Sequence, residues 1–215
     1  MKNKRLIWQI PFLLLLIFGS IYVIRQQQNT PYQRDEGFIF GTIYHITYQS
    51  DVNYQKEIEA ELQKVDNSLS PFNKTSIISR INRNEDVKVD NMFAEVFQLA
   101  EKISKETDGA FDITVAPMVN AWGFGFKTGN PPTQQTVDSL RAIVGFQKVT
   151  LKEEHVKKQN PHIMLDCSAI AKGYGSDIVA RFLKKKGIQN FMVEIGGEIV
   201  VNGNSDKQVP WRVGI

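Results

Sequence analysis

The stretch that decides the fold is Leu165-Asp-Cys-Ser-Ala-Ile-Ala-Lys-Gly-Tyr-Gly-Ser-Asp177. Asp166 ends an apolar run typical of a strand, and apolar residues recur every four positions from Ile170 onward, which predicts a helix. Backbone N–H groups at the start of such a helix, with Ser168 beside them and Lys172 as a positive charge, suit a phosphate or pyrophosphate. The segment therefore predicts a phosphate site, and an ordinary strand-to-helix turn is the alternative.

A second patch, between Thr107 and Gly125, combines acidic, aromatic and glycine residues. Asp112 and Thr114 are two residues apart, so in an extended segment their side chains share one face. Trp122 follows in a glycine-containing loop, where an aromatic ring and bare backbone can hold a flat heterocycle. The alternative is that Asp112 and Thr114 cap a turn while Trp122 fills core.

The rest of the chain mixes helical and β patterns without a regular β-α-β period, which favours an α+β fold. Apolar residues at helical spacing predict three further helices, and alternating residues predict several strands. The helices are expected between Asn53 and Leu69, between Phe93 and Ile103, and between Thr133 and Val144. The strands are expected at 38–48, 148–151, 162–166 and 191–201, with Gly196-Gly197 inside the last, and from Trp211 onward. Because the chain stops inside that final strand, we expect the protein to continue beyond Ile215.

Composition and charge narrow the class of protein. Apolar residues make up 42% of the chain and charged residues 23%, as in globular proteins. Three basic residues, Lys2, Lys4 and Arg5, account for the net charge of +3, and acidic and basic residues balance thereafter. A nucleic-acid-binding protein should have its basic excess on the folded part, so we exclude that class. Cys167 is the only cysteine, so no intramolecular disulfide can form, and we expect a buried thiol.

The N-terminus has the pattern of a membrane anchor. Residues 6–24 are apolar apart from two positions, and basic residues precede them, so we expect residues 1–25 to span the bacterial cytoplasmic membrane as a helix. This orientation places the rest of the chain on the periplasmic side. A cleaved signal peptide is the alternative. Residues 26–37 read as a linker, and residues 38–215 as the folded domain.

An ordered set of short motifs resembles the ApbE family, the FAD:protein FMN transferases. The set covers most of residues 38–215, and together its members are far more specific than any one alone. The motifs are Gly41-Thr-Ile-Tyr44, Val65-Asp-Asn-Ser-Leu-Ser-Pro-Phe72, Ser76-Ile-Ile-Ser-Arg-Ile-Asn82, Asp108-Gly-Ala-Phe-Asp-Ile-Thr114, Pro117, Asn120, Trp122-Gly-Phe-Gly125, Asp166–Gly173 and Gly196-Gly197.

The resemblance implies an ApbE-like fold and a transfer reaction. FAD is the substrate, Mg²⁺ lies on its pyrophosphate, a Thr or Ser hydroxyl of an acceptor protein attacks the FMN phosphorus, and AMP leaves. Family acceptors are extracytoplasmic subunits of redox complexes. We expect the segments around Asp112 and after Asp166 to converge on this one dinucleotide. Two other functions fit the same residues, a non-catalytic FAD-binding module and an Mg²⁺-dependent FAD pyrophosphatase.

The resemblance also implies individual site residues. The FAD contacts carry over to Phe40, Phe72, Ala110, Phe111, Asp112, Ser168 and Tyr174. Ala171 matches the position whose backbone carbonyl binds the metal. Phe40 departs from the family pattern, which commonly has Met there. The family's remaining metal ligands, an Asp and a Thr or Ala from a later segment, have no match here and would lie beyond Ile215, as would the residue that activates the acceptor.

Overall fold

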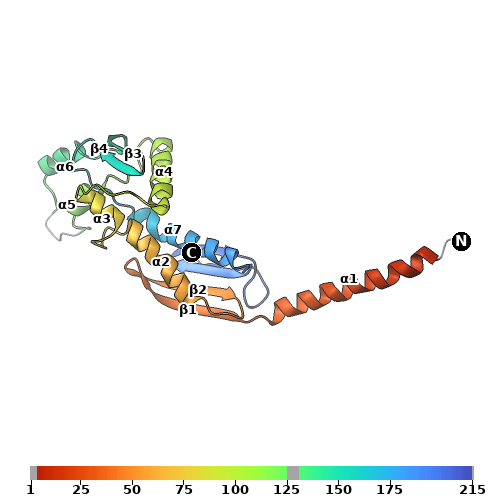
Figure 1. Ribbon diagram of the computed structural model, residues 1–215. Helices are drawn as coiled ribbons and strands as arrows, with labels where there is room; N and C mark the ends of the chain where they lie inside the picture. The colour runs from red at the N-terminus through yellow and green to blue at the C-terminus, as the bar shows by residue number, and fades with distance from the viewer. Residues whose placement is uncertain (1–3, 125–130, 215) are drawn as a thin grey trace.

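A four-stranded sheet lies between a second lobe rich in helices and a long N-terminal helix (Figure 1). The computed structural model describes residues 4–124 and 131–214, so Lys2, Gly125 and Ile215 lie outside the described residues. The helices are α1 (Lys4–Asn29), α2 (Gln55–Leu69), α3 (Ile77–Asn82), α4 (Asn91–Glu106), α5 (Ala116–Ala121), α6 (Gln134–Arg141), the 3₁₀ turn η1 (Phe146–Lys148) and α7 (Ser168–Lys185). The strands are β1 (Tyr32–Ile39), β2 (Thr42–Gln49), β3 (Val149–Lys152), β4 (His155–Lys158), β5 (Phe191–Ile195) and β6 (Glu198–Asn202).

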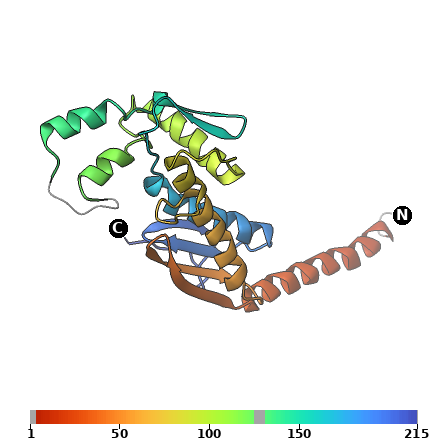
Figure 2. The same ribbon diagram turned by 60° about the vertical axis from the view of Figure 1, so that its left-hand side comes forward.

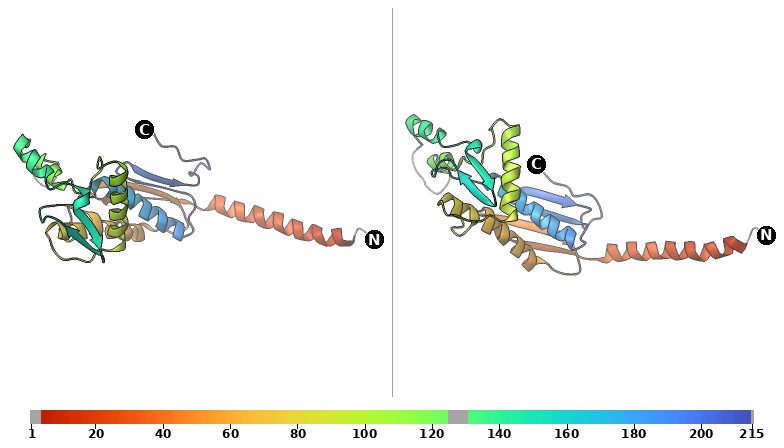
Figure 3. Two further views of the ribbon diagram at one scale, coloured as in Figure 1. Left: turned by 90° about the horizontal axis from the view of Figure 1, so that it is seen from above. Right: turned by 45° about the horizontal axis from the view of Figure 1, so that its top comes forward.

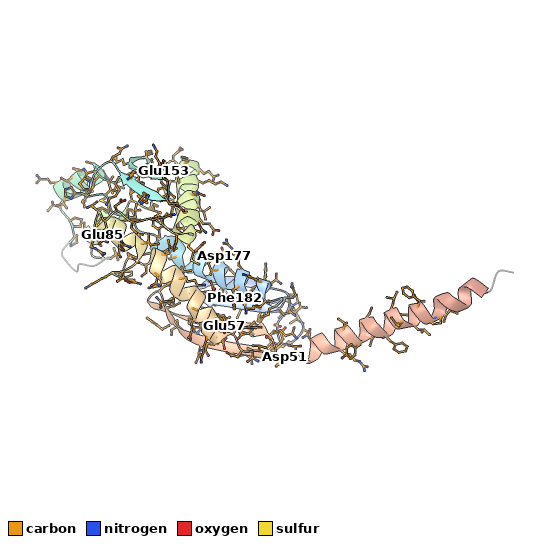
Figure 4. The ribbon with its side chains drawn as sticks, in the orientation of Figure 1. Asp51, Glu57, Glu85, Glu153, Asp177 and Phe182 are labelled. Carbon is orange, nitrogen blue, oxygen red and sulfur yellow. The ribbon has the colours of Figure 1, made fainter. Side chains whose placement is uncertain are left out.

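The sheet has the order β1-β2-β5-β6, and each neighbouring pair is antiparallel. Side chains alternate between its faces, so Tyr44, Ile46 and Tyr48 of β2 are all buried on one side. Helices α2 and α7 cover that side. Phe182 of α7 lies edge-on to the ring of Tyr54, with the centroids 6.0 Å apart (Figure 4). The mixed α+β architecture expected from the sequence is therefore confirmed.

The predicted helices are present. Capping side chains begin α4 and α6, whereas the N-cap residues of α2 and α7, Tyr54 and Cys167, make no such hydrogen bond. The apolar stripe predicted between Asn53 and Leu69 is buried in α2, although the helix begins one residue later than expected, after Tyr54. Asp90 accepts a hydrogen bond from the backbone N–H of Phe93 at the start of α4, which satisfies an otherwise unpaired donor. Thr133 has the same role at the start of α6.

Two stretches that the sequence predicts as single strands are hairpins. Ile39 pairs with Thr42 and Ile195 pairs with Glu198, so each connection has two residues. Both residues of each connection have positive φ, as tight hairpin turns require. Glycine accepts this conformation at 196 and 197, whereas the first turn places Phe40 at φ 52°. The prediction missed the turns because glycine within an apolar run indicates a bulge as readily as a reversal.

The second lobe has its own core, built mainly from α3, α4 and the segment before α7 (Figure 2). The rings of Phe93 and Phe97 stack within it, with centroids 6.1 Å apart. The β3–β4 hairpin lies against this lobe. The sequence predicts strands at 148–151 and 162–166, and β4 lies in the polar turn expected between them. The second of those strands, 162–166, forms only an isolated parallel bridge, between Val115 and Met164.

Three further expectations differ from the structure. Residues 32–37, placed in the linker, belong to β1 and pair with β2. Residues 116–121, for which the sequence predicts no helix, form the short helix α5, with Pro117 near its N-terminus, where proline needs no N–H partner. The loop expected around Trp122 follows it at residues 122–124. Residues 211–214 contain no strand, and the Trp211 indole donates to the carbonyl of Asn202 instead.

Helix α1 extends away from both lobes (Figures 1 and 3). Its side chains from Ile10 to Val23 are exposed. Within the ranges that the structure describes, no helix combines the length and apolar character needed to cross a membrane. The anchor predicted at residues 1–25 is therefore not confirmed.

The packing of Phe40 on α7 leads to a first prediction. A Cβ atom at Gly175 would lie 2.6 Å from Cε2 of Phe40, whereas one at Gly173 would meet nothing nearer than Oε2 of Glu198 at 4.0 Å. We expect Gly175→Ala to lower the free energy of unfolding by about 1–3 kcal/mol through overpacking. Gly173→Ala, in the same helix, should be neutral or stabilise by up to about 1 kcal/mol. Urea unfolding measures both, and equal effects would contradict this packing.

The single thiol supplies a second prediction. Cys167 is 1% exposed, as expected from the sequence, and burial raises its pKa to about 12. Only the thiolate reacts with alkylating reagents, so at pH 8 about one molecule in 10⁴ is reactive. We expect iodoacetamide to leave the folded protein unlabelled and to modify it rapidly in guanidinium chloride, as followed by intact mass. Stoichiometric labelling of the folded protein would refute the burial.

Candidate functional site

Two adjoining pockets lie where the β1–β2 turn, the loop after α2 and the start of α7 meet. The Lys172 pocket has a volume of about 160 Å³. Its walls come from all three of those elements. The lining residues are Phe40, Ser70, Pro71, Phe72, Ser168, Ala171 and Lys172. Four residues predicted from the sequence, Phe40, Phe72, Ser168 and Ala171, are therefore brought together here.

The Asp166 pocket has a volume of about 190 Å³ and shares Pro71, Phe72 and Ser168 with its neighbour. Helix α5 and the segment before α7 supply most of its other walls. The complete lining is Pro71, Phe72, Asn82, Ala116, Val119, Asn120, Phe124, Met164, Leu165, Asp166 and Ser168. Phe72 and Phe124 are 64% and 82% exposed, so two large aromatic rings stand at the surface of this pocket.

Polar groups at the start of α7 face the shared wall. The backbone N–H of Ser168 donates to Oδ1 of Asp166 at 2.7 Å, which fixes the turn into the helix. Lys172 donates from Nζ to the carbonyl oxygen of Gly196 at 3.0 Å, and a carboxylate oxygen of Glu198 lies 3.9 Å from the same atom. Among the described residues that line the two pockets, Lys172 is the only one with a cationic side chain. A helix start together with one ammonium group suits an anionic ligand.

The segments around Asp112 and Asp166 lie side by side, as expected. The backbone N–H of Asp166 donates to the carbonyl of Ile113 at 2.7 Å, and Val115 bridges Met164 in parallel. The two sequence patches predicted to converge therefore form one region of the fold.

The Asp112 carboxylate is occupied by contacts within this region. Its Oδ1 accepts from the backbone N–H and the hydroxyl of Thr114, both at 2.7 Å, and its Oδ2 accepts from the N–H of Phe146 at 2.8 Å. The Thr114 hydroxyl in turn accepts from the N–H of Gly145. Ala110 is exposed, and Phe111 packs partly into the core of the second lobe. These three predicted FAD contacts line neither pocket.

Tyr174 lies on another side of α7. It is 6% exposed and donates to Oε2 of Glu95 at 2.7 Å. Burial raises the pKa of Tyr174, and hydrogen bonds from Arg181 lower the pKa of Glu95. Tyr174 thus joins α7 to α4 and lines neither pocket.

The donor set for a metal is incomplete. No group of three or more His, Cys, Asp or Glu residues that could bind a metal occurs within the part of the chain that the structure describes. Ala171 lies inside α7, where regular helical geometry directs its carbonyl toward the N–H of Gly175. Among the described residues that line the two pockets, Asp166 is the one carboxylate.

Several lining residues were not predicted as site residues. Asn82 and Pro71 belonged to motifs that were quoted only for the resemblance, and Phe124 belonged to the aromatic loop. Met164 and Val119 are ordinary apolar residues, so no local pattern distinguishes them. A larger pocket of about 330 Å³ lies beside β4, and another of about 460 Å³ lies along α2 and α7. None of the predicted FAD contacts lines either of them.

Known proteins match both the sequence and the fold. The ApbE family matches residues 40–215. A FAD:protein FMN transferase from Vibrio cholerae is 39% identical over 164 residues, which cover 74% of this chain and 49% of that protein. One from Haemophilus influenzae is 40% identical over 170 residues, with the same coverage of 74% and 49%.

Solved structures agree with the sequence matches. The flavin transferase ApbE from Vibrio cholerae superimposes with a TM-score of 0.82 at 36% identity, covering 86% of this chain and 64% of that one. The apo flavinyl transferase ApbE from Pseudomonas stutzeri gives 0.80 at 29% identity, covering 86% and 66%. The chain belongs to the ApbE family. It spans about half the length of the curated relatives it matches.

The contacts of Asp112 generate a third prediction. Removing the carboxylate in Asp112→Ala leaves the N–H groups of Thr114 and Phe146 without their acceptor. We expect the free energy of unfolding to fall by about 2–3 kcal/mol. Asp138→Ala, at an exposed carboxylate on α6, should change it by less than about 0.5 kcal/mol. Circular dichroism during urea unfolding tests this, and equal stabilities would show that the Asp112 contacts are dispensable.

Proposed function

We propose that this chain binds FAD in the two adjoining pockets and serves as a FAD:protein FMN transferase. The observation that supports this most strongly is that one wall, formed by Phe72 and Ser168, is shared by both pockets. A dinucleotide is long and needs a flat surface for its rings beside a site for its phosphates. Phe72 offers the surface, and the start of α7 with Lys172 offers the anion site.

The proposed reaction is a transfer at phosphorus. A Thr or Ser hydroxyl of the acceptor attacks the FMN phosphorus, the bond to the AMP phosphate breaks, and the hydroxyl proton is lost. FMN stays on the acceptor as a phosphoester, and AMP leaves. We propose Mg²⁺ as the cation that neutralises charge on the pyrophosphate. Asp166 and Ser168 are two of the oxygen donors that line the pockets.

The proposed residue roles follow the positions of the side chains. Phe40 and Phe72 pack against a flavin or adenine ring, and Ser168 donates to a phosphate or ring oxygen. Asp112, with Ala110 and Phe111, acts on FAD by shaping the segment beside Asp166, because its carboxylate is already bonded to Thr114 and Phe146. Tyr174 supports the α7 backbone in the same indirect way.

We also propose that α1 tethers the protein to the bacterial cytoplasmic membrane, with the folded domain outside. The basic residues before an apolar run support this orientation. The acceptors would then be extracytoplasmic subunits of redox complexes. Extraction of membranes with alkaline carbonate tests the tether, and release of the protein into the supernatant would refute it.

A second candidate function is FAD binding or FAD hydrolysis without transfer. The incomplete metal-donor set among the described residues favours binding alone, because the hydrolysis, like the transfer, needs Mg²⁺. Binding of FAD without AMP release indicates a binding module. Mg²⁺-dependent AMP release without an acceptor indicates a pyrophosphatase. Covalent flavin fluorescence on an acceptor indicates the transferase, and EDTA should abolish the last two reactions.

The role of Lys172 gives a fourth prediction. Loss of its charge in Lys172→Gln should weaken FAD binding about tenfold, because a hydrogen bond to a charged group contributes about 1.5–3 kcal/mol. Lys185→Gln, at the other end of α7, is the matched control and should bind like the wild type. Isothermal titration of the full chain measures all three. Absence of FAD binding by the wild type would overturn the proposed function.

A further inference from the structure

The short helix α3 is hydrogen-bonded to the segment that carries Phe72, on one side of the two pockets. The Ser76 hydroxyl donates to the carbonyl oxygen of Ser70 at 2.6 Å. The Ser79 hydroxyl lies 3.1 Å from the carbonyl oxygen of Pro71 and 3.4 Å from that of Ser70. Both serines are buried, so water does not compete for these hydrogen bonds. The backbone that carries Phe72 is therefore fixed to the first turn of α3.

The last residue of α3, Asn82, is hydrogen-bonded to Leu165 on the opposite side of the Asp166 pocket. Asn82 donates from Nδ2 to the carbonyl oxygen of Leu165 at 2.9 Å and accepts from the N–H of Leu165 at 2.7 Å. This pairing satisfies both backbone groups of Leu165, as a neighbouring strand would. Lys158 adds two hydrogen bonds from Nζ, to the carbonyls of Ile81 at 3.0 Å and Ile163 at 2.9 Å.

The two fixed segments are the walls of the Asp166 pocket. Pro71 and Phe72 form one wall, and Leu165 and Asp166 form the other. Ser79 and Asn82 are three residues apart, so they project from neighbouring positions on one side of the helix. One rigid turn of helix thus separates the hydrogen bonds to one wall from those to the other.

We propose that α3 is a spacer that sets the separation of these walls, and that Asn82 is its principal positioning residue for FAD. The inference rests on the proposed function for the identity of the ligand. Asn82 acts through the backbone of Leu165, which leads directly to Asp166 and Ser168. A change at Asn82 should therefore alter FAD affinity as well as global stability.

Asn82→Asp tests this with a readout that depends on pH. The carboxylate still accepts from the N–H of Leu165, but at pH 8 it places a negative charge against the Leu165 carbonyl. Once protonated, the carboxyl group again has one donor and one acceptor. The protonated carboxyl group makes both hydrogen bonds to Leu165, whereas the carboxylate makes only one. The wall is therefore less stable once the pH rises above the carboxyl pKa. We expect FAD to bind about tenfold more weakly than to the wild type at pH 8, and the difference to shrink as the pH falls toward the carboxyl pKa.

Controls separate this effect from other titrations. Lys158 and Asp166 are titratable and lie on the same segments, so the wild type is measured at each pH and the ratio of dissociation constants is reported. Ser139→Ala removes a hydroxyl bonded to the carbonyl of Gln135 on α6, and it should leave FAD affinity unchanged. Flavin fluorescence titration at a temperature well below each melting midpoint keeps every variant folded. A dissociation constant for Asn82→Asp within about twofold of the wild-type value at pH 8 would overturn the proposal.

Hydrogen exchange distinguishes failure of the spacer from failure of the proposed function. Without FAD, the amides of residues 163–168 should exchange faster in Asn82→Ala than in the wild type, and those of Ser70, Phe72 and Asn73 should exchange faster in Ser76→Ala. If exchange is faster but neither the wild type nor any variant binds FAD, the spacer role of α3 is kept and FAD is overturned as the ligand. Unchanged exchange in 70–73 would overturn the spacer, whatever the FAD result.

Discussion

The structure depends on how the segment that enters α7 is held. Both backbone groups of Leu165 are bonded to the Asn82 amide, and the N–H of Asp166 is bonded to Ile113. This fixes the start of a helix that belongs to two cores. Ala171 and Tyr174 lie in the core of the second lobe, whereas the later turns of α7 lie in the core beneath the sheet. The pockets are at this junction because the two lobes meet there.

Phe40 has a strained backbone conformation at this junction. A bulky residue with φ of 52° is strained, and such a conformation costs about 1–3 kcal/mol. The ring rests in the space left by Gly175, and it packs partly against both cores. A tight turn made only of glycines would avoid the strain, but it would place no aromatic ring beside α7. The strained turn therefore supplies one wall of the Lys172 pocket.

The sequence predicts those helices and turns that the pattern of neighbouring residues specifies. Periodicity places α2, α4 and α7, and the strand-to-helix change places Ser168 at the start of a helix beside the pocket. It does not show that Gly196 reverses the chain, because pairing across the turn decides that. It also cannot show that Asp112 is already bonded to Phe146, or that Asn82 pairs with Leu165, since both contacts join residues far apart in the chain. Some of the predicted FAD contacts therefore line the pockets, namely Phe40, Phe72 and Ser168, and the others do not.

A crystal structure of the full chain with FAD tests the central claim most directly. The account predicts one ring of the dinucleotide against Phe72, with the pyrophosphate beside Ser168 and Lys172. Density for FAD in the larger pocket along α2 and α7, with the Phe72 wall unoccupied, would contradict it.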